Sequence, residues 1–154
     1  MATQILLEPI GFVHSQVKIT PKPEYDWSDA VSEIELAQAW QSGLDGLEQY
    51  SHVIVLYWAH KATDKAKMAL RVHYRGEVTL PKVGLFASRS PYRPNPLCMK
   101  VVRLLSVKGN ILHVQNLDAL DGTPVVDIKP FIPTNDVPTD VRVPDWNQFR
   151  SETP

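Results

Sequence analysis

The sequence is poor in cysteine: Cys98 is the only one among 154 residues. A single thiol cannot form an intrachain disulfide, and it excludes a zinc site built on several cysteine ligands. No apolar run approaches the ~20 residues of a membrane-spanning helix, and the first residues lack the basic and long apolar segments of a signal peptide. We therefore expect a protein of the reducing cytoplasm that does not associate with a membrane.

Short catalytic signatures are missing as well. The sequence contains no GxGxxG, P-loop, HExxH or GxSxG pattern, which removes the usual basis for dinucleotide, ATP, zinc-protease and serine-hydrolase functions. His52, His60 and His113 are candidate metal ligands, but no carboxylate is suitably placed beside them, so histidines of the core are favoured and we predict no metal. A hydrolase with a histidine-bound metal stays open as a third interpretation.

Proline, in contrast, is abundant, with 13 prolines against 7 glycines. Because proline ends helices and is excluded from central strand positions, short strands joined by rigid turns are favoured over a bundle of long helices. The apolar share of 44% and the charged share of 21% are ordinary for a globular protein. The length fits one domain, which we expect to span residues 1–154.

Several segments have the composition of strands. Ser51–His60 is the clearest, because it is β-branched, aromatic and nearly all apolar, and we expect both of its faces to be buried. Met99–Val107 and Ile111–Leu117 predict a hairpin. Further short strands are expected at residues 5–15, where Pro9 and Gly11 interrupt the pattern, and at 83–88 and 125–129.

Two segments are ambiguous or helical. Residues 33–36 alternate like a strand, although Ser32 and Glu35 also match a helix capping box. Short helical segments are expected at residues 43–49 and 64–72, the second capped by Asp64.

The strand count suggests a mainly β fold. Six or seven short strands with closely spaced turns, and one or two short helices, are typical of a sandwich or a small closed β-barrel, and periodicity does not decide between the two. From Pro130 onward the sequence is rich in proline. We expect an extended tail over about residues 130–154 that lies on the surface.

Charge is unevenly distributed along the chain. The net charge is −1, yet Lys61–Lys108 holds 11 of the 16 basic residues and only two acidic ones, so this segment carries +9 and the rest of the chain −10. Such segregation favours a basic face that meets phosphates. The alternative is that folding mixes the two parts.

A stiff turn carries many functional groups. Three prolines lie within six residues at 91–96 and leave this turn little conformational freedom. Two guanidinium groups there suit carboxylates or phosphates, Tyr92 can stack on a base, and Asn95 offers the donor and acceptor that a purine edge requires. The alternative is a rigid surface turn whose arginines pair with Asp118 or Asp121. The polar residues of the turn are Arg89, Ser90, Tyr92, Arg93 and Asn95.

A second segment of interest runs from Leu117 to Pro130. Asp127 and Lys129 lie two residues apart on an expected strand and therefore share a face, while Val126 and Ile128 are expected to point into the core. An acid and a lysine in this arrangement also fit an ordinary ion pair of small energetic value.

Together these segments carry a family resemblance. GLFASRSPYRPNPL (84–97), LDALDGTPVVDIKPF (117–131), PIGFVHS (9–15) and GLEQYSHVIVLYWAH (46–60) resemble the TsaA-like family of the TrmO type. The resemblance implies a small β-barrel rather than a Rossmann methyltransferase, and a homodimer. It also implies methyl transfer from S-adenosylmethionine to N6 of threonylcarbamoyl-adenosine 37, beside the tRNA anticodon.

The resemblance also implies roles for particular residues. Cofactor-binding positions carried over from the family are Tyr25, His60, Lys61, Arg89, Val101, Leu117, Asp118, Ala119 and Leu120. Asp118 is expected to accept a hydrogen bond from the amino group or the ribose of the cofactor. This chain departs from the family pattern at two positions, where Cys98 replaces a glycine and Lys100 a small hydroxyl residue.

For catalysis we expect acceptors that raise the reactivity of the adenine amino group, with Asn95 as first choice and Asp127 as second. Tyr92, Arg93 and Lys129 are the expected substrate-binding residues, with Tyr92 stacking on a base from the single-stranded anticodon loop. The main rival is a non-catalytic barrel that binds S-adenosylmethionine or a nucleotide as a sensor.

Overall fold

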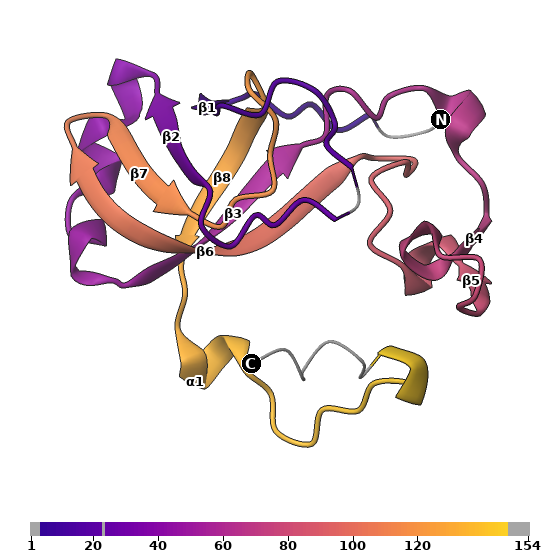
Figure 1. Cartoon of the computed structure of the whole chain (residues 1–154). Helices are drawn as coiled ribbons and strands as arrows, with labels where there is room; N and C mark the ends of the chain where they lie inside the picture. Colours follow the sequence, from indigo (N-terminus) through magenta and orange to yellow (C-terminus); the bar gives the residue numbers. More distant parts are fainter. Residues whose placement is uncertain (1–3, 23, 148–154) are drawn as a thin grey trace.

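The computed structural model describes residues 4–22 and 24–147. Six strands form a closed barrel in the order β1-β2-β7-β6-β3-β8, with every pair antiparallel and β8 returning to β1 (Figure 1). This confirms the small β-barrel and decides between the barrel and the sandwich. The barrel strands are β1 (Gly11–His14), β2 (Val31–Leu36), β3 (His52–Trp58), β6 (Leu97–Lys108), β7 (Ile111–Gln115) and β8 (Pro124–Pro130).

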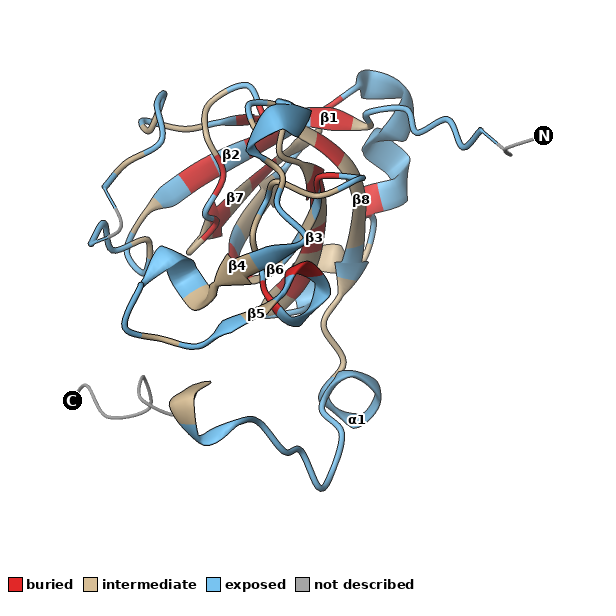
Figure 2. Cartoon of the chain, turned by 90° about the vertical axis from the view of Figure 1, so that its right-hand side faces the viewer, coloured by how far each residue is buried: buried red, intermediate tan, exposed pale blue. Residues whose placement is uncertain are grey.

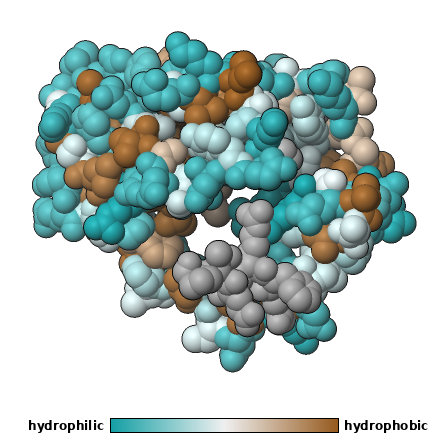
Figure 3. Space-filling view, viewed as in Figure 1, coloured by the Kyte–Doolittle hydropathy of each residue, from teal (hydrophilic) through white to brown (hydrophobic). Residues whose placement is uncertain are grey.

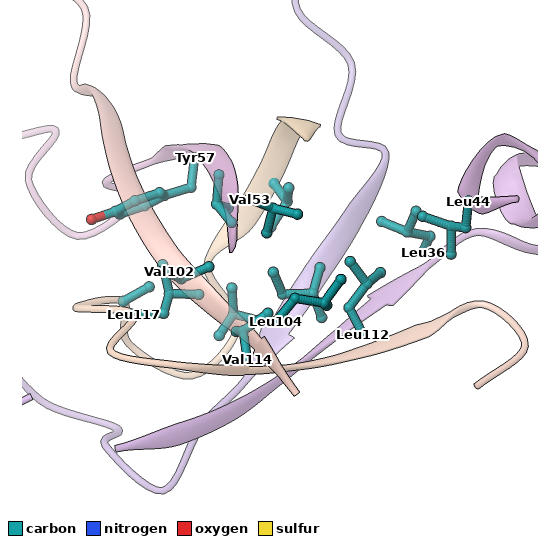
Figure 4. Close-up of a cluster of buried hydrophobic side chains, with 14 residues drawn as sticks. Leu36, Leu44, Val53, Tyr57, Val102, Leu104, Leu112, Val114 and Leu117 are labelled. Atoms are coloured by element: carbon teal, nitrogen blue, oxygen red, sulfur yellow. The ribbon is translucent and has the colours of Figure 1, made fainter. Parts of the chain in front are cut away.

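Alternate side chains of the barrel strands fill its interior. In β2 the inward residues are Ser32, Ile34 and Leu36, so this segment is a strand and not the start of a helix. In β3 they are Val53, Val55 and Tyr57. These side chains meet those of β6 and β7 in one apolar cluster (Figure 4). Figure 2 shows the buried residues gathered on the barrel, whereas the short helix α1 (Pro133–Asp136) is exposed.

The barrel closes where β1 crosses β2 and β8. Gly11 pairs with both Leu36 and Val125. A Cβ atom at Gly11 would lie 2.3 Å from the carbonyl oxygen of Glu35 and 2.8 Å from the Cα of Leu36. Only glycine permits this close approach of two backbones. Of the long strand expected at residues 5–15, only Gly11–His14 pairs with neighbours.

An irregularity in β8 corrects one sequence-based expectation. Leu56 pairs with Asp127 but Tyr57 pairs with Val125, so Val126 is an extra residue, as in a β-bulge. The bulge reverses the alternation on its N-terminal side. Val125 therefore enters the core in place of Val126, while Ile128 packs against the core as expected.

The outer face of β3 is also less covered than its sequence predicts. Val53, Val55 and Tyr57 are buried, but Ile54 and Leu56 on the opposite face are only half-buried. The expectation that both faces are buried is therefore wrong for this single chain. Three apolar pairs lie side by side on this face, because Trp58, Leu56 and Ile54 stand opposite Leu97, Met99 and Val101 of β6.

Two extensions leave the barrel. The first, which we call the arm, spans residues 61–88 and contains a small sheet of β4 (Arg71–His73) and β5 (Lys82–Gly84). Asp64 does cap a helical turn, since its carboxylate accepts from the amide of Ala66 at 3.0 Å, but that turn ends at Lys67 and does not reach residue 72.

The second extension is the described part of the tail, residues 131–147. It returns to the arm, where Trp146 packs edge-on against Tyr74 with 4.7 Å between ring centroids, and Asn147 accepts from the Tyr74 hydroxyl at 2.6 Å. Figure 3 shows open space between the barrel and the tail. The remainder of the expected tail, residues 148–154, lies outside the described residues.

The helical segments are all short. The 3-10 segments are Gln38–Leu44, Leu47–Gln49, Lys65–Lys67, Tyr74–Gly76, Leu85–Ala87 and Asp145–Asn147. Leu85–Ala87 follows β5 directly, so the strand expected at 83–88 ends early. Among the described residues, no helix has the length and apolar character needed to cross a membrane.

Candidate active site

Most of the predicted site residues lie on segments that join the strands at one end of the barrel, which we call the mouth. Because all strand pairs are antiparallel, β1, β3 and β7 end at the mouth, and β2, β6 and β8 begin there. The segments connecting these strands carry most of the predicted site residues. They are Tyr25, His60, Lys61, Arg89, Tyr92, Arg93, Asn95, Leu117, Asp118, Ala119 and Leu120.

The loop after β7 presents one carboxylate. Leu117 and Ala119 are buried in the core, with 0% and 2% of their surfaces exposed, so they anchor the loop, and only their backbone groups are available to a ligand. Asp118 between them points outward. Its Oδ1 accepts from the hydroxyl of Tyr57 at 2.7 Å, and its Oδ2 lies 3.9 Å from the ammonium of Lys100. The two partners come from β3 and β6.

Tyr57 was not among the residues predicted from the sequence. Burial, followed by the charge and hydrogen bond of Asp118, raises its pKa far above the ordinary value, so the hydroxyl stays protonated and donates. The two residues are 61 positions apart in sequence. The sequence held one signal for this role. Tyr57 carries a hydroxyl within a mostly apolar strand, and a buried Tyr usually finds a hydrogen-bond partner.

A second group of contacts lies where β3 and β1 leave the barrel. Thr123 Oγ1 and His60 Nδ1 are 3.4 Å apart, and Lys61 donates to the carbonyl of Lys18. Desolvation and then the neighbouring Lys61 lower the pKa of His60, so this imidazole is neutral at pH 7. Asp121 accepts from the amide of Ser15 at 3.0 Å, and this bond is the main reason its pKa is lowered.

A polar cavity of about 400 Å³ opens beside Asp121. Ser15, Lys18 and Asp121 line it, as does Ser32 from the start of β2. Ser32 is 2% exposed, and its hydroxyl has no hydrogen-bond partner among the described residues. An unpaired buried hydroxyl is costly, and this one lies beneath the polar wall of the cavity.

In the rigid turn the two arginines differ. Arg93 donates from Nη1 to the carbonyls of Ser88 and Ser90, at 3.0 and 3.3 Å, and its guanidinium lies over the ring of Phe86. Arg89 is exposed and makes no hydrogen bond or ion pair with the described residues. Neither arginine pairs with Asp118 or Asp121 in the described structure, which was the alternative for this turn.

The other polar groups of the turn are accessible. Asn95 is exposed and Tyr92 half-buried. The backbone carbonyl of Asn95 accepts from the amide of Leu97 at 2.7 Å, so this carbonyl is already engaged and the side-chain amide is the available group. Cys98, which follows the turn, is a packed thiol whose pKa is raised to about 11, first by burial and then by Asp118.

Three predicted residues lie elsewhere. Val101, Asp127 and Lys129 are on the outer face of the β6-β3-β8 sheet, because Val101 and Lys129 both stand opposite Ile54, and Asp127 opposite Leu56. Asp127 and Lys129 form an ion pair of 2.6 Å, as the ordinary interpretation expected. The single chain therefore does not bring them together with the mouth.

Tyr25 and the histidines complete the set. Tyr25 is exposed in the loop between β1 and β2 and packs against Trp27, with 4.9 Å between ring centroids. His52 contacts Ser51, while His113 contacts Glu33 and Ser106. The described residues contain no group of three or more His, Cys, Asp or Glu side chains that could hold a metal ion.

This barrel and its mouth can be compared with known proteins. The chain matches the tRNA-methyltransferase O N-terminal domain over residues 11–137. The chain belongs to this family. The match covers every barrel strand, the arm, the rigid turn and the loop that bears Asp118.

Individual relatives agree. An S-adenosyl-L-methionine-binding protein of Archaeoglobus fulgidus is 46% identical over 136 residues, covering 86% of this chain and 93% of the relative. The mouse tRNA (adenine(37)-N6)-methyltransferase is 33% identical over 164 residues, which cover 98% of this chain but 36% of that enzyme. The crystal structure of TrmO from Pseudomonas aeruginosa superposes with a TM-score of 0.71 at 30% identity, covering 91% of this chain and 62% of the other. The chain thus spans most of the archaeal relative but only part of the two methyltransferases.

Proposed function

We propose that this protein is a cytoplasmic methyltransferase that uses S-adenosylmethionine to methylate N6 of adenosine 37 in tRNA. The observation that carries the proposal is the Asp118 carboxylate at the mouth, which accepts from Tyr57 and lies near Lys100. The segments that connect the strands at this end also carry eight of the nine residues that the family resemblance assigned to the cofactor. The match to a tRNA-methyltransferase domain supports the reaction class. The names of the archaeal and mouse relatives support the cofactor and the target base.

The groups at the mouth fit the cofactor. A carboxylate has about four acceptor positions, and Asp118 uses one for Tyr57 and directs another toward Lys100. The others can accept from an amino group or from ribose hydroxyls. The exposed guanidinium of Arg89 suits the cofactor carboxylate, and Lys18 adds a further polar group.

The residues of the turn suit methyl transfer to an exocyclic amine. S-adenosylmethionine supplies an electrophilic methyl group when it is bound. Its transfer would break the bond between sulfur and the methyl carbon, form the bond between that carbon and N6, and release one proton from N6 to water. We assign the Asn95 side-chain oxygen to accept a hydrogen bond from the amino group, which localises its lone pair. Asp127 remains the second choice, and positioning supplies most of the rate enhancement, up to about 7–11 kcal/mol in favourable cases.

The arm supports the tRNA part of the proposal. Beyond Lys61, its basic residues Lys65, Lys67, Arg71, Arg75 and Lys82 are all exposed. Such a group can neutralise phosphates along an RNA strand. Tyr92, Arg93 and Lys129 remain the proposed substrate contacts, with Arg93 available through those guanidinium N–H groups that do not brace the turn.

We also propose that the protein is a dimer through the outer face of the β6-β3-β8 sheet. This face carries three cross-strand apolar pairs, with Leu97 and Met99 40% and 49% exposed. Asp127 and Lys129 at its edge offer opposite charges that a two-fold axis can pair between copies. Val101, Asp127 and Lys129 would then lie at the interface. Light scattering should give twice the monomer mass, and Leu56→Glu should give a folded monomer; a monomeric wild type would contradict this part.

The reaction is tested by incubating the protein with methyl-labelled S-adenosylmethionine and tRNA that carries threonylcarbamoyl-adenosine. We expect label in N6-methylated adenosine 37, and at least tenfold less with Asn95→Ala at unchanged cofactor affinity. Cofactor binding without transfer to any tRNA would favour the sensor. One observation favours the sensor as the second candidate function: Cys98 and Lys100 lie at the mouth, where the family pattern has smaller residues.

A further inference from the structure

The Asp118 carboxylate is restrained from both sides. The Tyr57 hydroxyl is 2.7 Å from Oδ1, and the Lys100 ammonium is 3.9 Å from Oδ2. Tyr57 and Lys100 both face the barrel interior, because Tyr57 pairs with Cys98 and Val55 with Lys100 on adjacent strands. Two neighbouring strands thus fix a carboxylate that belongs to a third segment of the chain.

Tyr57 is itself fixed by packing. The residue is 6% exposed and belongs to the apolar core. Figure 4 shows the phenol oxygen at the edge of the cluster, pointing away from the other labelled side chains. The hydroxyl position is therefore determined by the core, and so is the oxygen of Asp118 that accepts from it. A group held in place before a ligand arrives loses little freedom on binding.

Lys100 contributes charge as well as position. Its side chain is 33% exposed, so it is partly accessible at the mouth, and its ion pair is long enough to leave donor capacity free. In the partly desolvated mouth its charge is less screened than it would be in bulk water. It therefore opposes the binding of a second cation near Asp118.

We propose, on the basis of the function proposed above, that Tyr57 and Lys100 are positioning residues for Asp118, and that Lys100 also sets the preference of the mouth between the charged cofactor and its uncharged demethylated product. S-adenosylmethionine carries a sulfonium charge, and S-adenosylhomocysteine has a neutral sulfide at the same place. The two ligands are otherwise alike. The positive charge of Lys100 therefore lowers the affinity for S-adenosylmethionine relative to that for S-adenosylhomocysteine.

The test is calorimetry of both ligands with the full chain and four variants. Tyr57→Phe keeps the ring and removes the donor, so we expect both ligands to bind about tenfold more weakly, in the range of a lost hydrogen bond to a charged group. Lys100→Met keeps the length and removes the charge. We expect it to raise the affinity for S-adenosylmethionine relative to S-adenosylhomocysteine about threefold, from the Coulomb energy at several ångströms in a partly hydrated site.

Lys100→Arg restores the charge and should restore the wild-type ratio of the two dissociation constants. Lys108→Met, an exposed lysine at the opposite end of the barrel, is the matched control and should change neither ligand. A purely structural role for Lys100 would weaken both ligands equally, so the ratio separates the two explanations. Circular dichroism melting of each variant shows whether the fold is kept.

The outcomes separate this proposal from the function on which it rests. Suppose that the wild type binds both ligands. Tyr57→Phe at wild-type affinity would then overturn the positioning role alone, and Lys100→Met with an unchanged ratio of the two dissociation constants would overturn the charge role alone. Wild type that binds neither ligand overturns the proposed cofactor and this inference together. The inference is supported if Lys100→Met raises the affinity for S-adenosylmethionine relative to S-adenosylhomocysteine and Lys100→Arg restores the wild-type value.

Discussion

The barrel and the arm differ in how much of their apolar surface is buried and in how extensively their strands pair. The barrel contains most of the buried residues, in strands whose registers are fixed by long ladders of antiparallel pairs. The arm, residues 61–88, pairs only three residues with three in its own sheet, and buries only Leu85 and Ser88. It also exposes apolar side chains such as Leu70 and Val78, at 72% and 79%.

We infer from this difference that the barrel provides the stability of the protein and that the arm serves to bind RNA. Burial of apolar surface stabilises the barrel, and the same packing fixes Tyr57 and thereby the carboxylate at the mouth. The arm has little burial to stabilise it, and its exposed charges are free to meet a polyanion. We therefore expect changes in the barrel to alter folding and cofactor binding, and changes of exposed basic residues in the arm beyond Lys61 to alter RNA binding alone.

The largest effect is expected where the barrel closes. Gly11→Ala places a Cβ atom against the backbone of β2, and the resulting overpacking should destabilise the protein by about 3 kcal/mol, roughly a hundredfold in the folding equilibrium. Gly84→Ala in β5 of the arm meets nothing within 4 Å and is the matched control. Urea unfolding measures both; equal stabilities would contradict the contrast between the two regions.

A smaller effect concerns thiol reactivity. Since the pKa of Cys98 is raised to about 11, its thiolate is scarce at pH 8, and only part of this loss is offset by the greater nucleophilicity of a more basic thiolate. We expect iodoacetamide to react about twentyfold more slowly with Cys98 than with a cysteine on the arm, introduced as Ala69→Cys in Cys98→Ser protein. Asp118→Asn removes one cause of the raised pKa and should speed the reaction. Equal rates at the two positions would show that the mouth is open.

Loss of two basic residues from the arm should lower the affinity for tRNA about tenfold at moderate salt. Replacing Lys65 and Lys67 together with alanine should reduce the slope of log affinity against log salt by about 1.4–1.8, since each lost phosphate contact removes 0.7–0.9. The double replacement Arg103→Ala and Lys108→Ala, exposed charges on the barrel strand β6, is the control. Filter binding of tRNA at several salt concentrations measures both pairs, and a larger effect from the barrel pair would place the RNA elsewhere.

The smallest effect is expected at the contact between tail and arm. Tyr74→Phe removes the bond to Asn147 but keeps the ring contact with Trp146, and should cost about 1 kcal/mol locally. Limited proteolysis should then cut the tail a few times faster without changing the melting temperature of the barrel. A lower melting temperature would show that the tail is part of the barrel's cooperative unit.

Local patterns predicted much of this fold because they act through neighbouring residues. The hairpin of β6 and β7 follows from two alternating segments and a tight turn, and the ion pair of Asp127 and Lys129 from a spacing of two on one strand. The family resemblance added the closed barrel, which periodicity alone did not decide. Residues 33–36 were ambiguous in the sequence, and the structure shows that they belong to β2, which pairs with β1 on one side and β7 on the other.

The remaining features depend on contacts that a linear pattern does not contain. The bulge at Val126 follows from how β8 meets both β1 and β3, and the bond between Tyr57 and Asp118 joins residues far apart in sequence. The strands β4 and β5, at three residues each, are too short to show a period. The apolar outer side of β3 was correctly seen in the sequence, but the single chain does not bury it.

The most direct test of the account is a crystal structure of the protein grown with S-adenosylhomocysteine, the stable product of the proposed reaction. We expect density at the mouth, with a hydrogen bond from the ligand to the Asp118 carboxylate while Tyr57 still donates to the same group. Density at another part of the barrel, or at the mouth with Asp118 turned away from the ligand, would contradict the central claim.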